Sequence, residues 1–325
     1  MTSTPAVPVR PAVAWSWSGA LLGALCALPA AAVTLNDVPN GLAFAVGVLP
    51  ALVVGIQPTR RQRPRVTIIG ALAGASIVAG SILAHQPWLA VGGVFVLALA
   101  AAELARRRPI GQLALMLALP LVGVGLSYTD LDEAAGLALI MTIGAAYAGL
   151  VSMAWPERPA QPRPPAAPIG RDYGLRLGLA GAIAAAIGFA LDLDHAGWAC
   201  AAALLVMRPS AEMTQLRSIG RLAAVAAGAA IAALLVTQTT SATLYALPTV
   251  IALAAAAATR GSRWYITPGF TTFFALSLLI YDDPSESTSR FNERVLETAL
   301  GVALAYLFGL VIPAMRQQRH DVAIE

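Results

Sequence analysis

The stretch VTIIGALAGASIVAGSILA, residues 66–84, contains no charged side chain. A helix rises about 1.5 Å per residue, so roughly 20 apolar residues are enough to cross the hydrocarbon core of a bilayer. Similar apolar runs fill the rest of the chain. They lie at about 16–34, 41–57, 66–84, 88–105, 110–128, 135–155, 173–191, 196–207, 220–238, 243–259, 267–281 and 291–313. The sequence therefore predicts an all-α polytopic membrane protein with about twelve transmembrane helices.

The composition supports this fold class and excludes several functions. Of the 325 residues, 58% are hydrophobic and 12% are charged, and the mean hydropathy is +0.72. A soluble domain carries about 25% charged residues, so a soluble globular enzyme is excluded. All 21 basic residues are arginine. Without lysine the chain cannot form a Walker A site, a Schiff base or a Ser-x-x-Lys pair, so we expect neither an enzyme nor an ATP-driven pump.

The arginines predict how the chain is oriented in the membrane. Nineteen of the 21 fall on one side of the predicted spans, whereas the opposite loops are acidic. Since cytoplasmic loops are enriched in arginine, both termini should be cytoplasmic, in a multi-pass protein of the plasma (inner) membrane. The basic pI near 9.4 then reports topology, and we expect no nucleic acid partner. All six tryptophans lie at ends of apolar runs, where amphipathic rings favour the membrane interface.

The chain is predicted to contain two parallel six-helix repeats. Residues of the two halves match at an offset of 154 to 158, as in Arg106 with Arg260, Gly144 with Gly301 and Pro156 with Pro313. An even number of spans gives both repeats the same orientation, with a substrate path expected at their interface. The predicted parts are a cytoplasmic N-terminal segment (1–15), the first repeat (16–156), a Pro-rich cytoplasmic linker (157–172), the second repeat (173–313) and a cytoplasmic tail (314–325).

Small residues and prolines mark helix contacts and helix breaks. Gly-x-x-x-Gly pairs at 19 and 23, and again at 174 and 178, lie in equivalent first helices, where small residues let backbones approach closely. Broken helices at matching positions of two repeats are the best pointer to a transport path. We therefore expect the second and fifth helix of each repeat to line it, with breaks at Pro50, Pro120, Pro209 and Pro268.

Candidate binding residues are concentrated in the second half. Arg208 ends a short apolar run, and Arg217 and Arg221 follow four residues apart on one helix face. A buried arginine offers a two-pronged donor to a carboxylate, although Arg208 could instead extend to the surface and pair with Glu212. Arg217 and Arg221 form either a cationic vestibule or contacts to lipid phosphates.

The last apolar run adds Arg294 and Glu297, which lie three residues apart near its start. Glu297 could exchange protons or complement a substrate cation, but a paired structural charge is the alternative. The three histidines are scattered without ligand spacing, so we expect no metal and no cofactor. Cys26 and Cys200 lie inside apolar runs and are expected to be buried.

One stretch resembles a known family. The helix that opens with His195-Ala-Gly-Trp198, and the residues after it, are similar to the fusaric acid resistance family; the matching residues are His195, Trp198, Pro209, Thr214, Arg217 and Arg221. Arg294-x-x-Glu297-Thr-x-x-Gly301 is also similar to the family pattern. The resemblance covers about 173–313. It implies export of aromatic carboxylic acids or related amphipathic compounds, and a distant kinship with plant aluminium-activated malate transporters, which are anion channels.

These observations predict a transporter that exports small organic, and in particular aromatic, carboxylic acids, driven by the proton gradient. The predicted substrate-binding residues are Arg208, Arg217, Arg221, Trp198, His195, Arg294 and Glu297. The expected partners are the organic anion, membrane lipid and, as an option, further copies of the chain. Two alternatives stay open. One is a passive organic-anion channel, and the other is a non-transporting membrane scaffold in envelope assembly.

Overall fold

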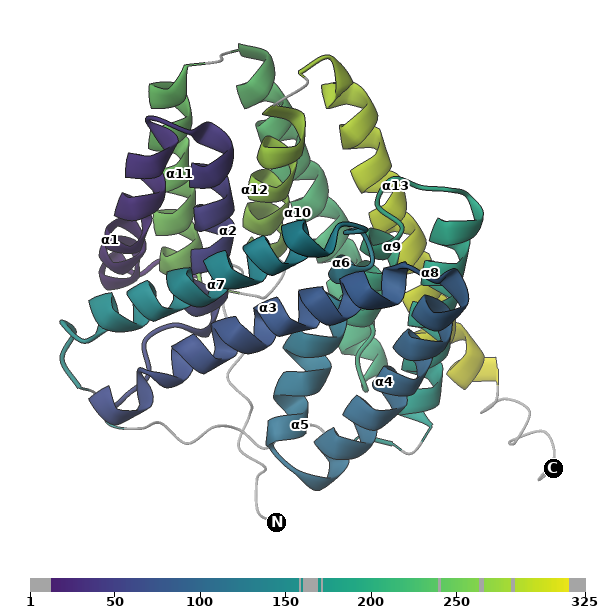
Figure 1. Ribbon diagram of the computed structural model, residues 1–325. Helices are drawn as coiled ribbons and strands as arrows, with labels where there is room; N and C mark the ends of the chain where they lie inside the picture. The colour runs from purple at the N-terminus through teal and green to yellow at the C-terminus, as the bar shows by residue number, and fades with distance from the viewer. Residues whose placement is uncertain are drawn as a thin grey trace.

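We describe the protein from a computed structural model, shown in Figure 1, over residues 13–157, 159, 169–170, 172–238, 241–262, 266–281 and 284–315. Within these residues the chain is helical and contains no strand. The first half comprises α1 (Trp17–Thr34), α2 (Val38–Val54), α3 (Arg65–Ala84), α4 (Pro87–Arg107), α5 (Ile110–Leu113), α6 (Leu119–Gly125) and α7 (Leu131–Ser152). The second half comprises α8 (Tyr173–Ala190), α9 (Gly197–Val206), α10 (Ala211–Gln238), α11 (Ala242–Ala258), α12 (Thr267–Tyr281) and α13 (Ser287–Tyr306).

Among the described residues, seven helical segments are long and apolar enough to cross a membrane, and five apolar segments are shorter. The prediction of a helical membrane protein is therefore confirmed. The short segments include α9 and the Ile110–Gly125 segment, in which α5 and α6 are joined by a π-helical turn, Ala114–Ala118, just before Pro120. Proline lacks a backbone N–H and disturbs the preceding turn of a helix, which accounts for the irregularity.

Local sequence fixes several helix starts. The Ser16 and Asp37 side chains accept hydrogen bonds from the backbone N–H groups of Gly19 and Asn40, at 3.2 and 3.1 Å. Asp130 accepts from the N–H of Asp132 at the start of α7. Pro87 occupies the first turn of α4, where its missing N–H costs nothing. These residues satisfy donors that the first turn of a helix leaves open.

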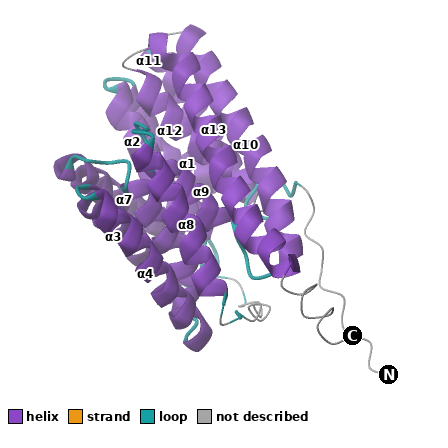
Figure 2. Ribbon diagram, turned by 90° about the vertical axis from the view of Figure 1, so that its right-hand side faces the viewer, coloured by secondary structure: helices purple, strands orange, loops and turns teal. Residues whose placement is uncertain are grey.

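Helices of the two halves interleave. α1 packs along α11, and in a matching way α4 packs along α8. Within each half, α3 packs against α7 and α10 against α13. Figure 1 shows α3 and α7 side by side, and Figure 2 shows α10, α12 and α13 grouped on the opposite side of the molecule from α3, α4 and α7. The apolar core has two main parts, and each takes residues from both halves of the chain.

The Gly-x-x-x-Gly pairs lie where the halves meet. A Cβ atom on Gly19 would lie 2.7 Å from the Ala257 carbonyl oxygen in α11. A Cβ atom on Gly174 would lie 2.8 Å from the Ala102 side chain in α4. Both glycines thus permit a backbone approach that any larger residue would prevent. The packing role predicted for these motifs agrees with the structure.

Arg63 has a role that the sequence did not reveal. It lies between two predicted spans, on the arginine-rich side where a solvent-exposed loop is expected, but its side chain is 0% exposed. Its guanidinium group donates to the carbonyl oxygens of Ser152, Trp155 and Pro156 at 2.7, 2.8 and 3.0 Å. These carbonyls follow the end of α7, where a helix leaves its last acceptors without partners. Arg63 therefore anchors the end of α7 to the segment between α2 and α3.

Replacing Gly23 by valine should destabilise the protein by more than about 2 kcal/mol, because the added side chain would meet the backbone of Leu253 and Ala254 in α11. Gly92→Val is the matched control, since nothing lies within 4 Å of a Cβ at that position. Reversible unfolding in mixed micelles measures both variants. Equal stability of the two would contradict the close packing of α1 on α11.

Replacing Arg63 by lysine should lower the free energy of unfolding by about 2–3 kcal/mol, because an ammonium group cannot serve the three carbonyls as the guanidinium fork does. The exposed Arg61, changed to lysine in the same way, should cost less than about 0.5 kcal/mol. The same unfolding measurement applies. A loss for Arg63→Lys no larger than for Arg61→Lys would show that the carbonyl contacts contribute nothing.

Candidate functional site

The short helix α9 lies in the middle of the second half and positions the candidate site. Nine of its ten residues are buried. It ends at Val206, and Met207 is extended before Pro209. Non-helical backbone at membrane depth must be satisfied by protein groups. Here the Tyr173 hydroxyl donates to the Met207 carbonyl at 3.1 Å, and the Arg208 N–H donates to the Thr214 hydroxyl at 3.0 Å.

Three predicted arginines lie just beyond this break. Arg208 and Arg221 are each 5% exposed, and Arg217 is half-buried. The guanidinium groups of Arg208 and Arg217 donate weakly to the carbonyl oxygens of Met207 and Leu205, at 3.5 and 3.4 Å. The alternative in which Arg208 extends to the surface does not fit this burial. Glu212 is exposed, and no ion pair joins it to Arg208 in the described part of the chain.

Arg294 and Glu297 project from α13 beside the opposite end of α9. The Cζ atom of Arg294 lies 4.0 Å from the centroid of the Trp198 ring, a cation–π contact. The His195 ring stacks on Trp198 with centroids 4.1 Å apart. Arg294 is 8% exposed and Glu297 is 3% exposed. The two interact electrostatically, yet among the described residues they form no ion pair within 4.0 Å.

The four arginines 208, 217, 221 and 294 form one group, which we call the arginine cluster. Arg221 lies within electrostatic range of both Arg294 and Arg208, and Arg208 within range of Arg217. The Nε atoms of Arg208, Arg221 and Arg294 are buried without a hydrogen-bond acceptor among the described residues. Glu297 is the one buried carboxylate in this part of the chain. Burying charge without a partner is costly, so the arrangement favours binding of an anion.

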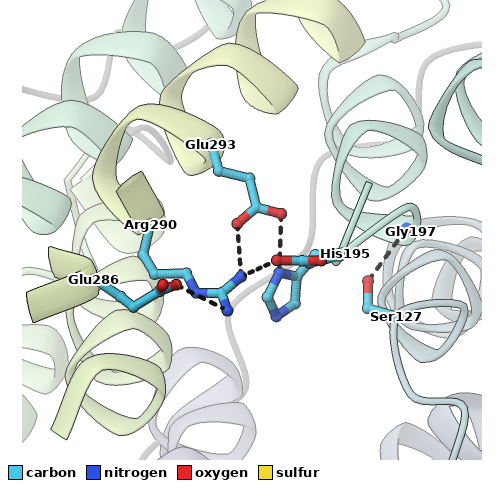
Figure 3. Close-up of polar contacts among 7 residues, drawn as sticks. Ser127, His195, Gly197, Glu286, Arg290 and Glu293 are labelled. Atoms are coloured by element: carbon cyan, nitrogen blue, oxygen red, sulfur yellow. Dashed lines mark hydrogen bonds and ion pairs between the residues drawn. The ribbon is translucent and has the colours of Figure 1, made fainter. Parts of the chain in front are cut away.

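A polar network, which we call the Arg290 network, covers the His195 end of α9 (Figure 3). Arg290 contacts Asp194, Glu293 and Glu286 at 2.5, 3.2 and 3.3 Å. The His195 Nδ1 atom lies 3.1 Å from a Glu293 oxygen. The network thus links α13 to the segment between α8 and α9. Next to it, the Gly197 N–H donates to the Ser127 hydroxyl at 3.2 Å, which joins the start of α9 to the residues after α6.

The structure brings all seven predicted binding residues into one connected region. His195 stacks on Trp198, and Trp198 contacts Arg294, which lies beside Glu297 on α13. Arg294 is within electrostatic range of Arg221, Arg221 of Arg208, and Arg208 of Arg217. The binding residues predicted from the sequence did not include Glu293, Asp194, Tyr173 or Thr214, although Thr214 is one of the residues that carry the family resemblance. The closely spaced acids before His195 and after Arg290 were a signal for the first two. No sequence signal marked Tyr173, which reaches the helix break from α8.

The helices with the predicted proline breaks come from both halves of the chain, whereas the arginines of the site come from one. α6, which carries Pro120, packs on α9. α12, which carries Pro268 in its first turn, packs on α2, which carries Pro50. The arginine cluster, by contrast, lies on α10, α13 and the residues after α9, all in the second half. Residues after α6 reach it: Tyr128 interacts electrostatically with Arg294. Within the described residues, no three His, Cys, Asp or Glu side chains are placed to hold a metal ion.

An apolar groove of about 1050 Å³ lies between α10, α11 and α12. Its walls include Gly220, Ala224, Ile251 and Phe270, and no charged residue lines it. One of its walls is α10, the helix that also carries Arg217 and Arg221. Among the described residues that line the groove no charged group is placed to bind an anionic head, so the arginine cluster remains the candidate site.

Comparison with known proteins identifies part of the chain. Residues 183–308 match the family model described as fusaric acid resistance protein-like. The resemblance predicted from the sequence is therefore confirmed over α9–α13, the helices that carry the arginine cluster. No curated protein and no solved structure matches the chain.

Replacing Arg290 by glutamine should open the His195 end of α9 with little loss of stability. Its partners Asp194 and Glu286 are about half exposed or more, and ion pairs of that kind contribute at most about 1 kcal/mol each. A cysteine at Ser127 should then react several-fold faster with a water-soluble maleimide. Arg290→Lys, which keeps the charge, should leave the rate nearly unchanged. Equal labelling rates in all three proteins would show that the Arg290 network does not close this end.

Proposed function

We propose that the protein is a membrane transporter that moves small organic anions, with aromatic carboxylic acids as the substrate class, by way of the arginine cluster. The observation that carries the proposal is the excess of buried positive charge: Arg208, Arg221 and Arg294 are nearly inaccessible and their Nε atoms have no acceptor among the described residues, whereas Glu297 is the one buried carboxylate there. An exchangeable anion supplies the missing partner. Arginine suits this role because its planar fork matches a carboxylate and does not lose its proton.

The match of residues 183–308 to the fusaric acid resistance protein-like family model supports a role in transport or resistance. The rings of Trp198 and His195 beside Arg294 support an aromatic substrate, because they place flat apolar surface next to a cation. Export, rather than uptake, stays a prediction from the resemblance. In that direction Arg208 and Arg217, at the predicted cytoplasmic end of α9, would receive the anion first.

We further infer a twelve-span architecture of two repeats, and the packing supports it. The contact of α1 with α11 corresponds to that of α4 with α8, and the contact of α2 with α7 corresponds to that of α9 with α13. A Cβ atom on Gly144 would meet the backbone of Gly47 in α2, and one on Gly301 would meet the backbone of Ala199 in α9. These glycines are the pair that the repeat offset predicts.

The two halves do not share the arginine cluster. At the offset of Gly144 and Gly301, the counterparts of Arg294 and Glu297 are the apolar Leu137 and Ile140. Arg63, the counterpart of Arg217 at an offset of 154, donates to carbonyl oxygens instead. The first half therefore acts as the structural partner in this proposal, and the second half carries the anion.

The test is uptake of labelled benzoate by proteoliposomes that contain the full chain. Arg208→Ala and Arg221→Ala should each lower the initial rate at least tenfold, because each removes a cation from the path. Arg106→Ala is the control. Arg106 lies at the end of α4, pairs with Glu103 at the surface and should transport normally. Membrane insertion and thermal stability are checked for every variant.

Normal rates in both cluster variants would remove the arginine cluster from the mechanism. Wild-type flux that carries a current following the Nernst potential of benzoate would favour the passive channel. Absence of benzoate transport by the folded wild type would favour the non-transporting scaffold.

A further inference from the structure

Glu297 stands out within the arginine cluster because nothing in the described part of the chain pairs with it. Only 3% of Glu297 is exposed. Neither carboxyl oxygen accepts a hydrogen bond among the described residues. A buried ionised carboxylate needs a donor or a cation close by, and a proton is the simplest partner it can take. The site is therefore arranged so that the charge of Glu297 can change.

The charged groups around Glu297 come from several elements. On α13 itself they are Arg294 and Glu293, one turn away. The segment between α8 and α9 contributes Asp194, and His195 through its contact with Glu293. Arg221 on α10 and Tyr128 after α6 act on Arg294.

The remaining neighbours of α13 are engaged elsewhere. Arg176 on α8 pairs with Asp172 at 3.1 Å, and Tyr281 on α12 contacts the ring of Tyr245. Arg294 is thus the nearest cation to Glu297 and also the cation that an anionic substrate would meet.

The ionised carboxylate of Glu297 and the carboxylate of the substrate compete for the positive charge of Arg294. When Glu297 is ionised, it offsets the charge of Arg294 and repels an incoming anion. When Glu297 holds a proton, the positive charge of Arg294 is available to the substrate. This argument rests on the proposed function. We propose that Glu297 takes up a proton when the anion binds beside Arg294, so that one proton travels with each anion.

The sign of this coupling follows from reciprocity. If a proton on Glu297 strengthens anion binding, the bound anion must strengthen proton binding by the same factor. Proton and anion then move in the same direction, and the passage of a monocarboxylate is electrically neutral. Exchange of a proton for the anion would need the opposite sign, in which each weakens the binding of the other. This sign differs from the sequence prediction, because export driven by an inward proton gradient requires exchange of a proton for the anion, whereas co-transport under that gradient drives uptake.

The experiment is isothermal titration of the purified full chain in nanodiscs with benzoate, in buffers of different ionisation enthalpy. The slope of the observed enthalpy against the buffer enthalpy gives the number of protons taken up. For the wild type we expect uptake of up to one proton per benzoate. Its affinity should fall by up to about tenfold per pH unit where Glu297 loses its proton. Glu297→Gln, which mimics the protonated form, should bind benzoate without uptake and without pH dependence.

Two controls assign the proton. Glu286→Gln should keep the uptake, because it changes a half-exposed carboxyl that pairs with Arg290 and is not among the binding residues. Glu103→Gln changes an exposed carboxyl on α4 and should behave as the wild type. Proton release, absence of uptake in the wild type, or uptake that persists in Glu297→Gln would overturn the proposal. Absence of benzoate binding in the folded wild type would instead overturn the proposed function, and the coupling would fall with it.

Discussion

The cost of burying positive charge among helices is the constraint on which this structure depends. Arg208, Arg221 and Arg294 are nearly inaccessible, and their Nε atoms find no acceptor among the described residues. Arg63 shows how the same chain treats an arginine that only supports the fold: its guanidinium group is surrounded by backbone carbonyls. Within one protein, one buried arginine is thus satisfied by its fold and others are left with capacity to bind. That contrast supports a binding role for the arginine cluster.

The rest of the fold places these charged side chains next to one another. α9 is short, so its end and the residues after it lie inside the protein, where Tyr173 and Thr214 satisfy the open backbone. Small residues let α9 lie close to α13, since Gly301 packs on its backbone. This contact brings Trp198 under Arg294. The interleaving of α1 with α11 and of α4 with α8 then holds the two halves together around the second-half site.

Much of this arrangement follows from sequence patterns, and the exceptions have physical reasons. Apolar runs located the helices because hydropathy marks membrane spans directly. The start of α10 at Ala211 was missed by about nine residues, because Glu212, Gln215 and Arg217 interrupt the apolar pattern. The arginines of the site were found from their position next to a short helix. The carbonyl contacts of Arg63 and the Arg290 network join segments about 90 or more residues apart, and such contacts leave no periodic signal.

The central claim is that an organic anion binds between α9, α10 and α13, within the arginine cluster. The most direct test is an experimental structure of the full chain with 4-bromobenzoate, in which anomalous scattering locates the bromine. The account predicts one bound molecule with its carboxylate beside Arg221 and Arg294. A bromine found only in the apolar groove between α10, α11 and α12, or none at saturating ligand, would contradict it.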